Sequence, residues 1–384
     1  MFNLSPEALQ ELKAFRKEIH RHPELGYTEK GTTDRIENFL RDHGVAFHRF
    51  ENLTGGYALI DAGGDRTLGF RCDIDALPLT ENTGVDFASQ TPGIMHACGH
   101  DMHTAIGAGL AVALNQNKGL MHRSAVVLFQ PAEECNPRGG AKPVIETGFL
   151  KNLKISEMYG MHVWPSLPVG TIALRAGTLM GASDHFRIEI GGKKSHAAEP
   201  HRGVDAISIA AQVYTALVHR LRREVSPFSG SLVSIGGFNS TGRYNVICDH
   251  VTLEGTLRST DAQSRDHVRA RIPEIVRHIA EAERGSAEVF LDSGFGIVDN
   301  DKGLFESFSS FAAERLGDDK VKRDITPSMI GEDFSVFCAE VPSLYCFMGC
   351  DCPYPLHSDR FIPQEGCLEA AVNLFSNYFL NRKF

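Results

Sequence analysis

Apolar residues in the first part of the chain follow the spacing of helices and then of short buried strands. They recur at helical intervals after Pro6, and a second helix fits residues 32–43, with Gly44 directly after its end. Short apolar runs predict strands at residues 57–60, 68–72, 125–129 and 158–163, with a helix of small residues at 104–114. This alternation of strands and helices predicts an α/β domain with a largely parallel sheet.

The middle of the chain has longer strands in which apolar and polar residues alternate. Two helical stripes lie among these strands, and together they give the order β-α-β-β-α-β, which is typical of a ferredoxin-like domain. We therefore predict an α/β domain built from residues 1–182 and 292–384, interrupted by a ferredoxin-like α+β domain at residues 183–291.

Length and composition agree with two domains and exclude several classes of protein. The chain has 384 residues, 42% hydrophobic and 23% charged, which is ordinary globular composition. A formal net charge of −9 argues against nucleic-acid binding through the overall field. No apolar run of about 18 residues predicts a membrane span, and the start lacks the pattern of a signal peptide. We expect a cytoplasmic protein whose nine cysteines are reduced.

Four short segments concentrate residue types that bind metals, and each follows or ends a predicted strand. Open α/β sheets place their sites at such strand ends. The adjacent carboxylates Glu133 and Glu134 could divide the work, one binding metal and the other acting as a general base. Each segment alone also fits an ordinary buried or surface position, so the prediction depends on all four: His96–His103, Gln130–Glu134, Gly160–Trp164 and Pro355–Asp359.

These segments together supply five candidate ligands. Five ligands exceed one closed tetrahedral site and suffice for two adjacent ions with open positions for water and substrate. The mixture of sulfur, nitrogen and oxygen suits Zn, Mn, Co or Ni and argues against Mg or Ca. The candidates are Cys98, His100, Glu134, His162 and His357.

The chain resembles the M20 metallopeptidase family over nearly its whole length. Within that family it is most similar to the amidohydrolases that include hippurate hydrolases, N-acyl-amino-acid hydrolases and auxin-conjugate hydrolases. The most specific motif of this branch is H-A-C-G-H-D-M-H at residues 96–103. Other similar segments follow in family order, at residues 16–29, 71–78, 133–134, 160–162, 195–200, 331–334 and 356–358. The resemblance implies a zinc-peptidase-like catalytic domain with an inserted lid domain, through which the protein would form a homodimer.

The resemblance also implies roles for the candidate ligands and for Glu133. The five candidates would bind two divalent ions, with Cys98 able to bridge them. Glu133 would be the general base and then the proton donor to the leaving amine. Asp73 matches a carboxylate that orients a metal-binding histidine in other branches. Those branches have a histidine ligand where this chain has Arg71, so no ligand role is carried to Arg71.

Two residues of the insert match substrate-binding positions of the family. His196 would reach the scissile carbonyl, in related dimers across the subunit interface, and Asn245 would help to bind substrate. Cys248 follows Asn245-Val246-Ile247 where the family usually has proline, which leaves the shape of this loop open.

We therefore expect a metal-dependent amidohydrolase that cleaves the amide bond of small N-acyl amino acids, such as hippurate-like or N-acetyl compounds. Three alternatives stay open. A dipeptidase or aminopeptidase of the same family would share every metal residue. A hydrolase could instead use Cys98 as its nucleophile with a nearby histidine. A non-catalytic binding protein could keep the fold, although it would not need Glu133.

Overall fold

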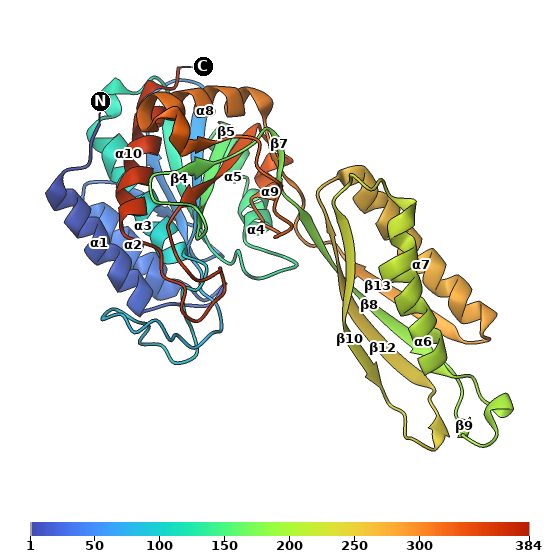
Figure 1. Cartoon of the computed structure of the whole chain (residues 1–384). Coiled ribbons are helices and arrows are strands. Elements are labelled where there is room, and N and C mark those ends of the chain that lie inside the picture. The colour runs from blue at the N-terminus through green and yellow to red at the C-terminus, as the bar shows by residue number, and fades with distance from the viewer. Residues whose placement is uncertain (1, 384) are drawn as a thin grey trace. The chain divides into compact units, whose positions relative to one another are not determined.

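The described residues of this computed structural model, 2–383, divide into two units. The smaller unit comprises Met180–Val298 and a short returning segment, Pro327–Glu332, and the larger unit comprises the other described residues. Each unit has its own buried core, and Figure 1 shows the helices and strands of each. Among residues 2–383 there is no helix of the length and apolarity that a membrane crossing requires.

The larger unit is built on a sheet of eight strands in the order β1-β2-β4-β3-β5-β16-β6-β15. The four strands in its middle, β4, β3, β5 and β16, run parallel, as the alternating pattern predicts. β3, β4 and β16 are buried at every position, as expected for parallel strands covered on both faces. The bounds are Phe47–Arg49, Gly56–Ile60, Thr67–Asp73, Ser124–Gln130, Ile155–Trp164, Ile172–Ala173, Val321–Lys322 and Ser343–Gly349 for β1 to β6, β15 and β16.

Helices α1 and α2 begin and end close to where the sequence predicts them, and Gly44 follows α2 with a left-handed φ of 71°. The sequence predicts the next helix at residues 104–114, whereas α3 begins at His100, inside the metal-binding motif. The apolar periodicity starts only at Thr104, so it does not reveal the first turn. The helices of this unit are Pro6–Arg21, Lys30–Asp42, His100–Gln116, Ala141–Glu146, Phe149–Asn152, Lys302–Leu316, Ser335–Cys338 and Gly366–Asn381 for α1 to α5, α8, α9 and α10.

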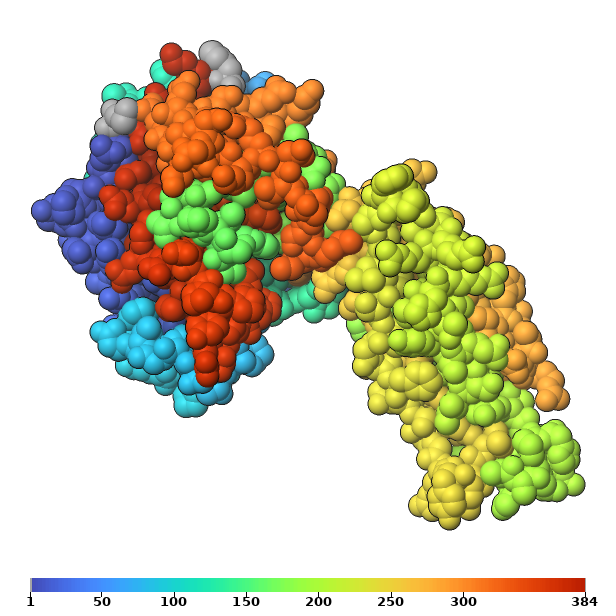
Figure 2. All heavy atoms as spheres, in the orientation of Figure 1, coloured from blue at the N-terminus to red at the C-terminus, as the bar shows by residue number. Residues whose placement is uncertain are grey.

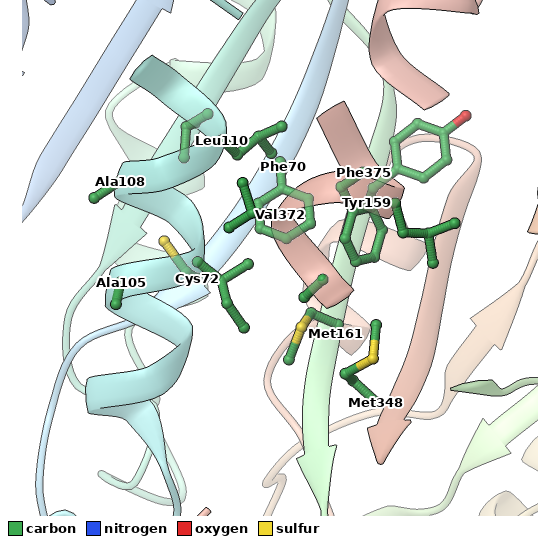
Figure 3. Packing of buried hydrophobic residues seen from close by; sticks show 14 of the residues in the cluster. Phe70, Cys72, Ala105, Ala108, Leu110, Tyr159, Met161, Met348, Val372 and Phe375 are labelled. Carbon is green, nitrogen blue, oxygen red and sulfur yellow. The ribbon is translucent and has the colours of Figure 1, made fainter. Parts of the chain in front are cut away.

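The core of the larger unit lies between the sheet and α3 and α10. α3 packs closely on β3 because it is rich in small residues: a Cβ at Gly107 would lie 2.3 Å from Cys72 Sγ. On the α10 side, the Phe375 ring stacks on Phe308 and meets Phe70 edge-on at a centroid distance of 4.8 Å (Figure 3). The two ends of the chain also meet in this unit, where Phe2 N donates to Asn377 Oδ1 at 2.9 Å. In Figure 2 their blue and red surfaces lie side by side.

The smaller unit has the predicted β-α-β-β-α-β order and an antiparallel sheet in the order β10-β12-β8-β13. Helices α6 and α7 pack on this sheet. The apolar stripe predicts one helix over 204–221, whereas α6 ends at Thr215. A π-helical turn and then a 3₁₀ turn follow it as far as Glu224. The bounds are Ala182–Gly191, Ala206–Thr215, Ser231–Ser240, His250–Ser259, Ala262–Ala282 and Ser286–Asp292 for β8, α6, β10, β12, α7 and β13.

Replacing Phe375 by alanine should destabilise the larger unit by about 3–5 kcal/mol, because the lost ring leaves a cavity between α10 and the sheet. Phe375 is 1% exposed. The free energy of unfolding would be measured by urea denaturation. Leu120→Ala is the control: this leucine is 66% exposed, and its loss should cost less than about 0.5 kcal/mol. Equal costs for the two variants would contradict the packing described here.

Candidate metal centre

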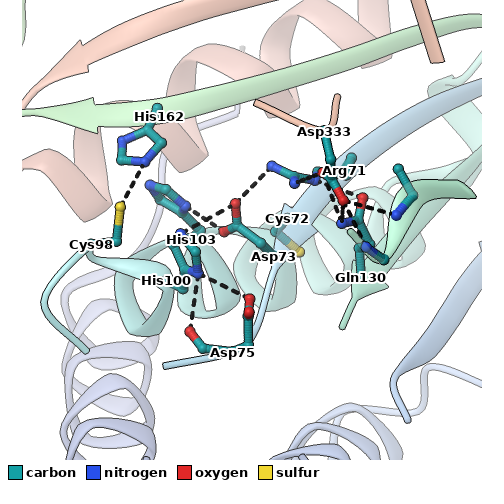
Figure 4. A network of polar contacts seen from close by, with 12 residues as sticks. Arg71, Cys72, Asp73, Asp75, Cys98, His100, His103, Gln130, His162 and Asp333 are labelled. Carbon is teal, nitrogen blue, oxygen red and sulfur yellow. Dashed lines mark hydrogen bonds and ion pairs between the residues drawn. The ribbon is translucent and has the colours of Figure 1, made fainter. Parts of the chain in front are cut away.

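The four segments that carry candidate ligands meet at the edge of the sheet where the parallel strands end. Asp73 is the last residue of β3, Gln130 is the last of β4, and His162 lies near the end of β5. Carboxyl ends of parallel strands share one edge, so these side chains and the loops after them come together (Figure 4). His100 joins them from the first turn of α3, which Gly99 precedes with a left-handed φ of 87°.

The five candidate ligands converge in two overlapping groups. The ligand atoms of Cys98, His100 and His162 all lie within 4.8 Å of one another, and so do those of Cys98, Glu134 and His357. Cys98 Sγ lies 3.3 Å from His162 Nε2. His357 Nε2 lies 3.2 Å from Glu134 Oε1. Because Cys98 belongs to both groups, its thiol could bind a metal ion in either of them.

Glu133 lies beside these ligands. One of its carboxylate oxygens groups with the ligand atoms of His100 and Glu134, again within 4.8 Å. Its side chain is buried, with 6% of the residue exposed. A carboxylate next to the ligands can take a proton from water bound between them.

Hydrogen bonds leave one nitrogen of His100 and of His162 for a metal. His162 Nδ1 donates to Val163 O at 2.7 Å, so Nε2 faces Cys98. His100 Nδ1 donates to Asp75 O at 3.0 Å, and its buried Nε2 lies 3.5 Å from Asp73 Oδ2 but makes no hydrogen bond in residues 2–383. Buried polar atoms are rarely left without a hydrogen bond, and a metal ion would satisfy this one. The donor set therefore fits a metal centre.

His103, also in the motif, has no nitrogen left for a metal. Its Nε2 accepts a hydrogen bond from Val163 N at 2.9 Å, so the proton is on Nδ1, which donates to Asp73 Oδ1 at 2.6 Å. The histidine that Asp73 orients is thus His103. His100 is instead oriented by Asp75, which sequence reasoning missed although it stands two residues after Asp73.

Arg71 is a buried ion-pair centre behind the candidate ligands. It donates from Nη1 to Asp73 Oδ2 at 2.7 Å, from Nη2 to Asp333 Oδ1 at 2.6 Å and from Nε to Gln130 Oε1 at 3.0 Å. Burial alone would raise the pKa of Asp73, but the charges of His100 and Arg71 hold it well below its usual range. The guanidinium therefore fixes the ends of β3 and β4 relative to each other.

The charges of the site favour a cation. Burial, together with Glu134 and Glu133, raises the pKa of the Cys98 thiol well above its usual range. Burial opposes the charged form of His100, but Asp73 and Asp75 raise its pKa to about 10. Both groups hold protons that a bound metal ion would displace.

Two non-glycine residues at the site have left-handed backbones. Ala132, directly before Glu133, has φ 58°, and His357 has φ 63°. Such conformations cost on the order of 1–3 kcal/mol, and surrounding contacts must maintain them.

The candidate substrate residues lie in the smaller unit, next to each other. His196 is exposed in the short strand β9 (Ser195–His196), which pairs with β11 (Val246–Ile247). Ala197 N donates to Asn245 O at 3.1 Å, which joins the two segments. Cys248, where proline is usual, is buried, and its thiol lies 3.2 Å from His250 O.

Comparison with known proteins gives one family over most of the chain. The model of peptidase family M20/M25/M40 matches residues 69–381. The N-acetyl-L-cysteine deacetylase of Bacillus subtilis is 36% identical over 373 residues, or 96% of this chain and 87% of that protein. The N-acetyldiaminopimelate deacetylase of Bacillus velezensis is 34% identical over 96% of this chain and 98% of its own. The structure of the Bacillus subtilis YXEP protein, a dinuclear metal-binding peptidase from the M20 family, has a TM-score of 0.85 and 33% identity, covering 97% of both chains.

Replacing Cys98 by alanine should remove at least one bound ion, because both ligand groups lose their shared atom. In the unchanged protein, metal affinity should rise with pH, by up to about tenfold per unit for each proton displaced, and the variant should lose the part due to the thiol. Metal content and zinc titrations over a range of pH test this.

The matched control is Cys72→Ala, which removes another buried thiol, on β3, and should keep the metal content. Wild-type metal content and an unchanged pH dependence in Cys98→Ala would show that Cys98 is not a ligand.

Proposed function

Because the chain belongs to peptidase family M20/M25/M40, we propose that it hydrolyses small N-acyl amino acids with Glu133 as general base beside two metal ions. It is a metal-dependent amidohydrolase, like the deacetylases to which it is similar over nearly its whole length. The observation that carries the proposal is the convergence of Glu133 with the ligand atoms of His100 and Glu134. We assign the ions to Cys98, His100, Glu134, His162 and His357, and propose Zn, Mn, Co or Ni as the metal.

Amide hydrolysis needs a strong nucleophile at neutral pH and a stabiliser for the negative charge that develops on the carbonyl oxygen. Two divalent ions held by the five assigned ligands would supply both, by lowering the pKa of water and by polarising the carbonyl. Glu133 takes the proton of the attacking water and gives it to the departing amine.

We propose that the smaller unit is a lid and a dimerisation unit, and that His196 and Asn245 bind substrate. Its strand β10 is an edge strand of the described sheet and exposes Leu232 and Phe238. An edge with exposed apolar side chains is suited to pairing with a second copy. All nine cysteines, each within the described part, are free thiols, which supports a reducing compartment such as the cytoplasm.

Glu133→Gln should keep the metal content and lose about 10²- to 10⁴-fold in kcat, because glutamine cannot accept the proton. The protein would be freed of metal, reloaded separately with Zn, Mn, Co and Ni, and given N-acetyl and N-benzoyl amino acids and dipeptides. Amine release from the acylated amino acids is the expected result.

Other outcomes identify the alternatives. Cleavage of dipeptides alone would identify a peptidase of the same family. A Glu133→Gln protein with full activity would contradict the role of this carboxylate. Inactivation by thiol alkylation with both ions retained would favour Cys98 as nucleophile.

A further inference from the structure

The turn that carries Glu133 has a backbone that must be held in place. It follows β4 and includes Ala132, which is fully buried with its left-handed φ of 58°. A left-handed backbone is unfavourable for alanine, and the methyl side chain of Ala132 cannot form a hydrogen bond that would stabilise it. The constraint must therefore come from neighbouring groups.

Two buried carboxylates capture the backbone amides on either side of Glu133. Glu29 Oε1 accepts a hydrogen bond from Ala132 N at 2.8 Å, and Asp75 Oδ2 accepts one from Glu134 N at 2.9 Å. Glu29 is fully buried and Asp75 is 1% exposed. Hydrogen bonds to carboxylates are about twice as strong as neutral ones, so the turn is held from both ends.

Each carboxylate is held in turn by a different part of the chain. Glu29 Oε2 accepts a hydrogen bond from Thr54 Oγ1 at 2.5 Å, and Glu29 lies at the start of α2. Asp75 Oδ1 lies 3.2 Å from His100 Nδ1. Glu29 thus contacts the turn without contacting any candidate ligand, whereas Asp75 contacts both the turn and His100.

We propose that Glu29 and Asp75 are positioning residues that together clamp the turn around Glu133 and direct its carboxylate toward the metal centre. The inference rests on the proposed role of Glu133 as general base. Glu29 acts on the turn through Ala132 N, directly before the base. Asp75 acts on the base and on metal binding, because it also fixes the ring of His100.

The difference between alanine and glutamine at position 29 tests this role. Alanine leaves Ala132 N–H buried without its acceptor, so the turn can relax. Glutamine keeps a carbonyl oxygen for that amide and can place its own amide against Thr54. Burial raises the pKa of Glu29 to about 7, so a neutral side chain is compatible with this position near neutral pH.

Glu29→Ala should lower kcat by about 10- to 100-fold, the range seen when groups that orient a site are lost. KM and metal content should change less than kcat, since the side-chain hydrogen bonds of Glu29 go to Ala132 N and Thr54. Glu29→Gln should restore most of kcat. Asp75→Asn should lower both kcat and metal affinity. If Glu29→Ala does not fold, Thr54→Val, which removes the hydroxyl holding Glu29, should give a smaller fall in kcat with unchanged metal content.

The matched control is Glu157→Ala. Glu157 is a largely buried carboxylate near the start of β5, bound by Arg123, Arg382 and Tyr159. The Glu157→Ala variant should have a lower melting temperature and an unchanged kcat. Full kcat in Glu29→Ala and Thr54→Val, or a Glu29→Gln protein as slow as Glu29→Ala, would overturn the clamp. An inactive Glu133→Gln beside a fully active Glu29→Ala would refute the clamp alone, whereas an active Glu133→Gln would refute the proposed function itself.

Discussion

The carboxylates buried at one edge of the larger sheet each need a compensating partner, because an isolated ionised carboxylate is unstable in a protein interior. Much of the local geometry follows from how this need is met. Asp73 is compensated by Arg71 and His103, and Asp333 by Arg71, Gln130 and two backbone amides. Asp75 and Glu29 each accept a hydrogen bond from an amide of the turn around Glu133, and burial still raises the pKa of Glu29 to about 7. The ion pairs and hydrogen bonds of these carboxylates thus also fix the shape of the site.

Hydrogen bonds also distinguish histidines that can bind a metal from one that cannot, which the sequence does not do. His100, His103 and His162 are all buried and lie close together. His100 and His162 each use one ring nitrogen in a hydrogen bond to a backbone carbonyl and direct the other toward the candidate ligands. In His103 both ring nitrogens are hydrogen-bonded. His103 is thus excluded as a ligand by the hydrogen bond that it accepts from Val163 N, 60 residues further along the chain. Spacing within a motif carries no record of that bond.

Sequence predicted the parts of the fold that local patterns determine. Strand β3 and helix α1 follow apolar periodicity, and the order of elements in the smaller unit follows from alternation along each strand. The four segments that carry candidate ligands were expected to lie close together, because the carboxyl ends of parallel strands share one edge of the sheet. The contribution of Glu29 could not be foreseen, because its partner Ala132 lies about a hundred residues away and offers only a backbone amide. The return of Pro327–Glu332 to the smaller unit likewise depends on contacts that no periodicity records.

The order of segments in the larger sheet has a consequence for biosynthesis. β16 lies inside the sheet, between β5 and β6, yet it is translated after the whole of the smaller unit. Before β16 is translated, β5 has an open edge, and the proposed metal centre lacks His357. The contiguous stretch 180–298 leaves the ribosome earlier and brings its own core with it. The nascent protein can therefore fold its inserted part first, and the proposed set of ligands is complete only after His357 has been translated.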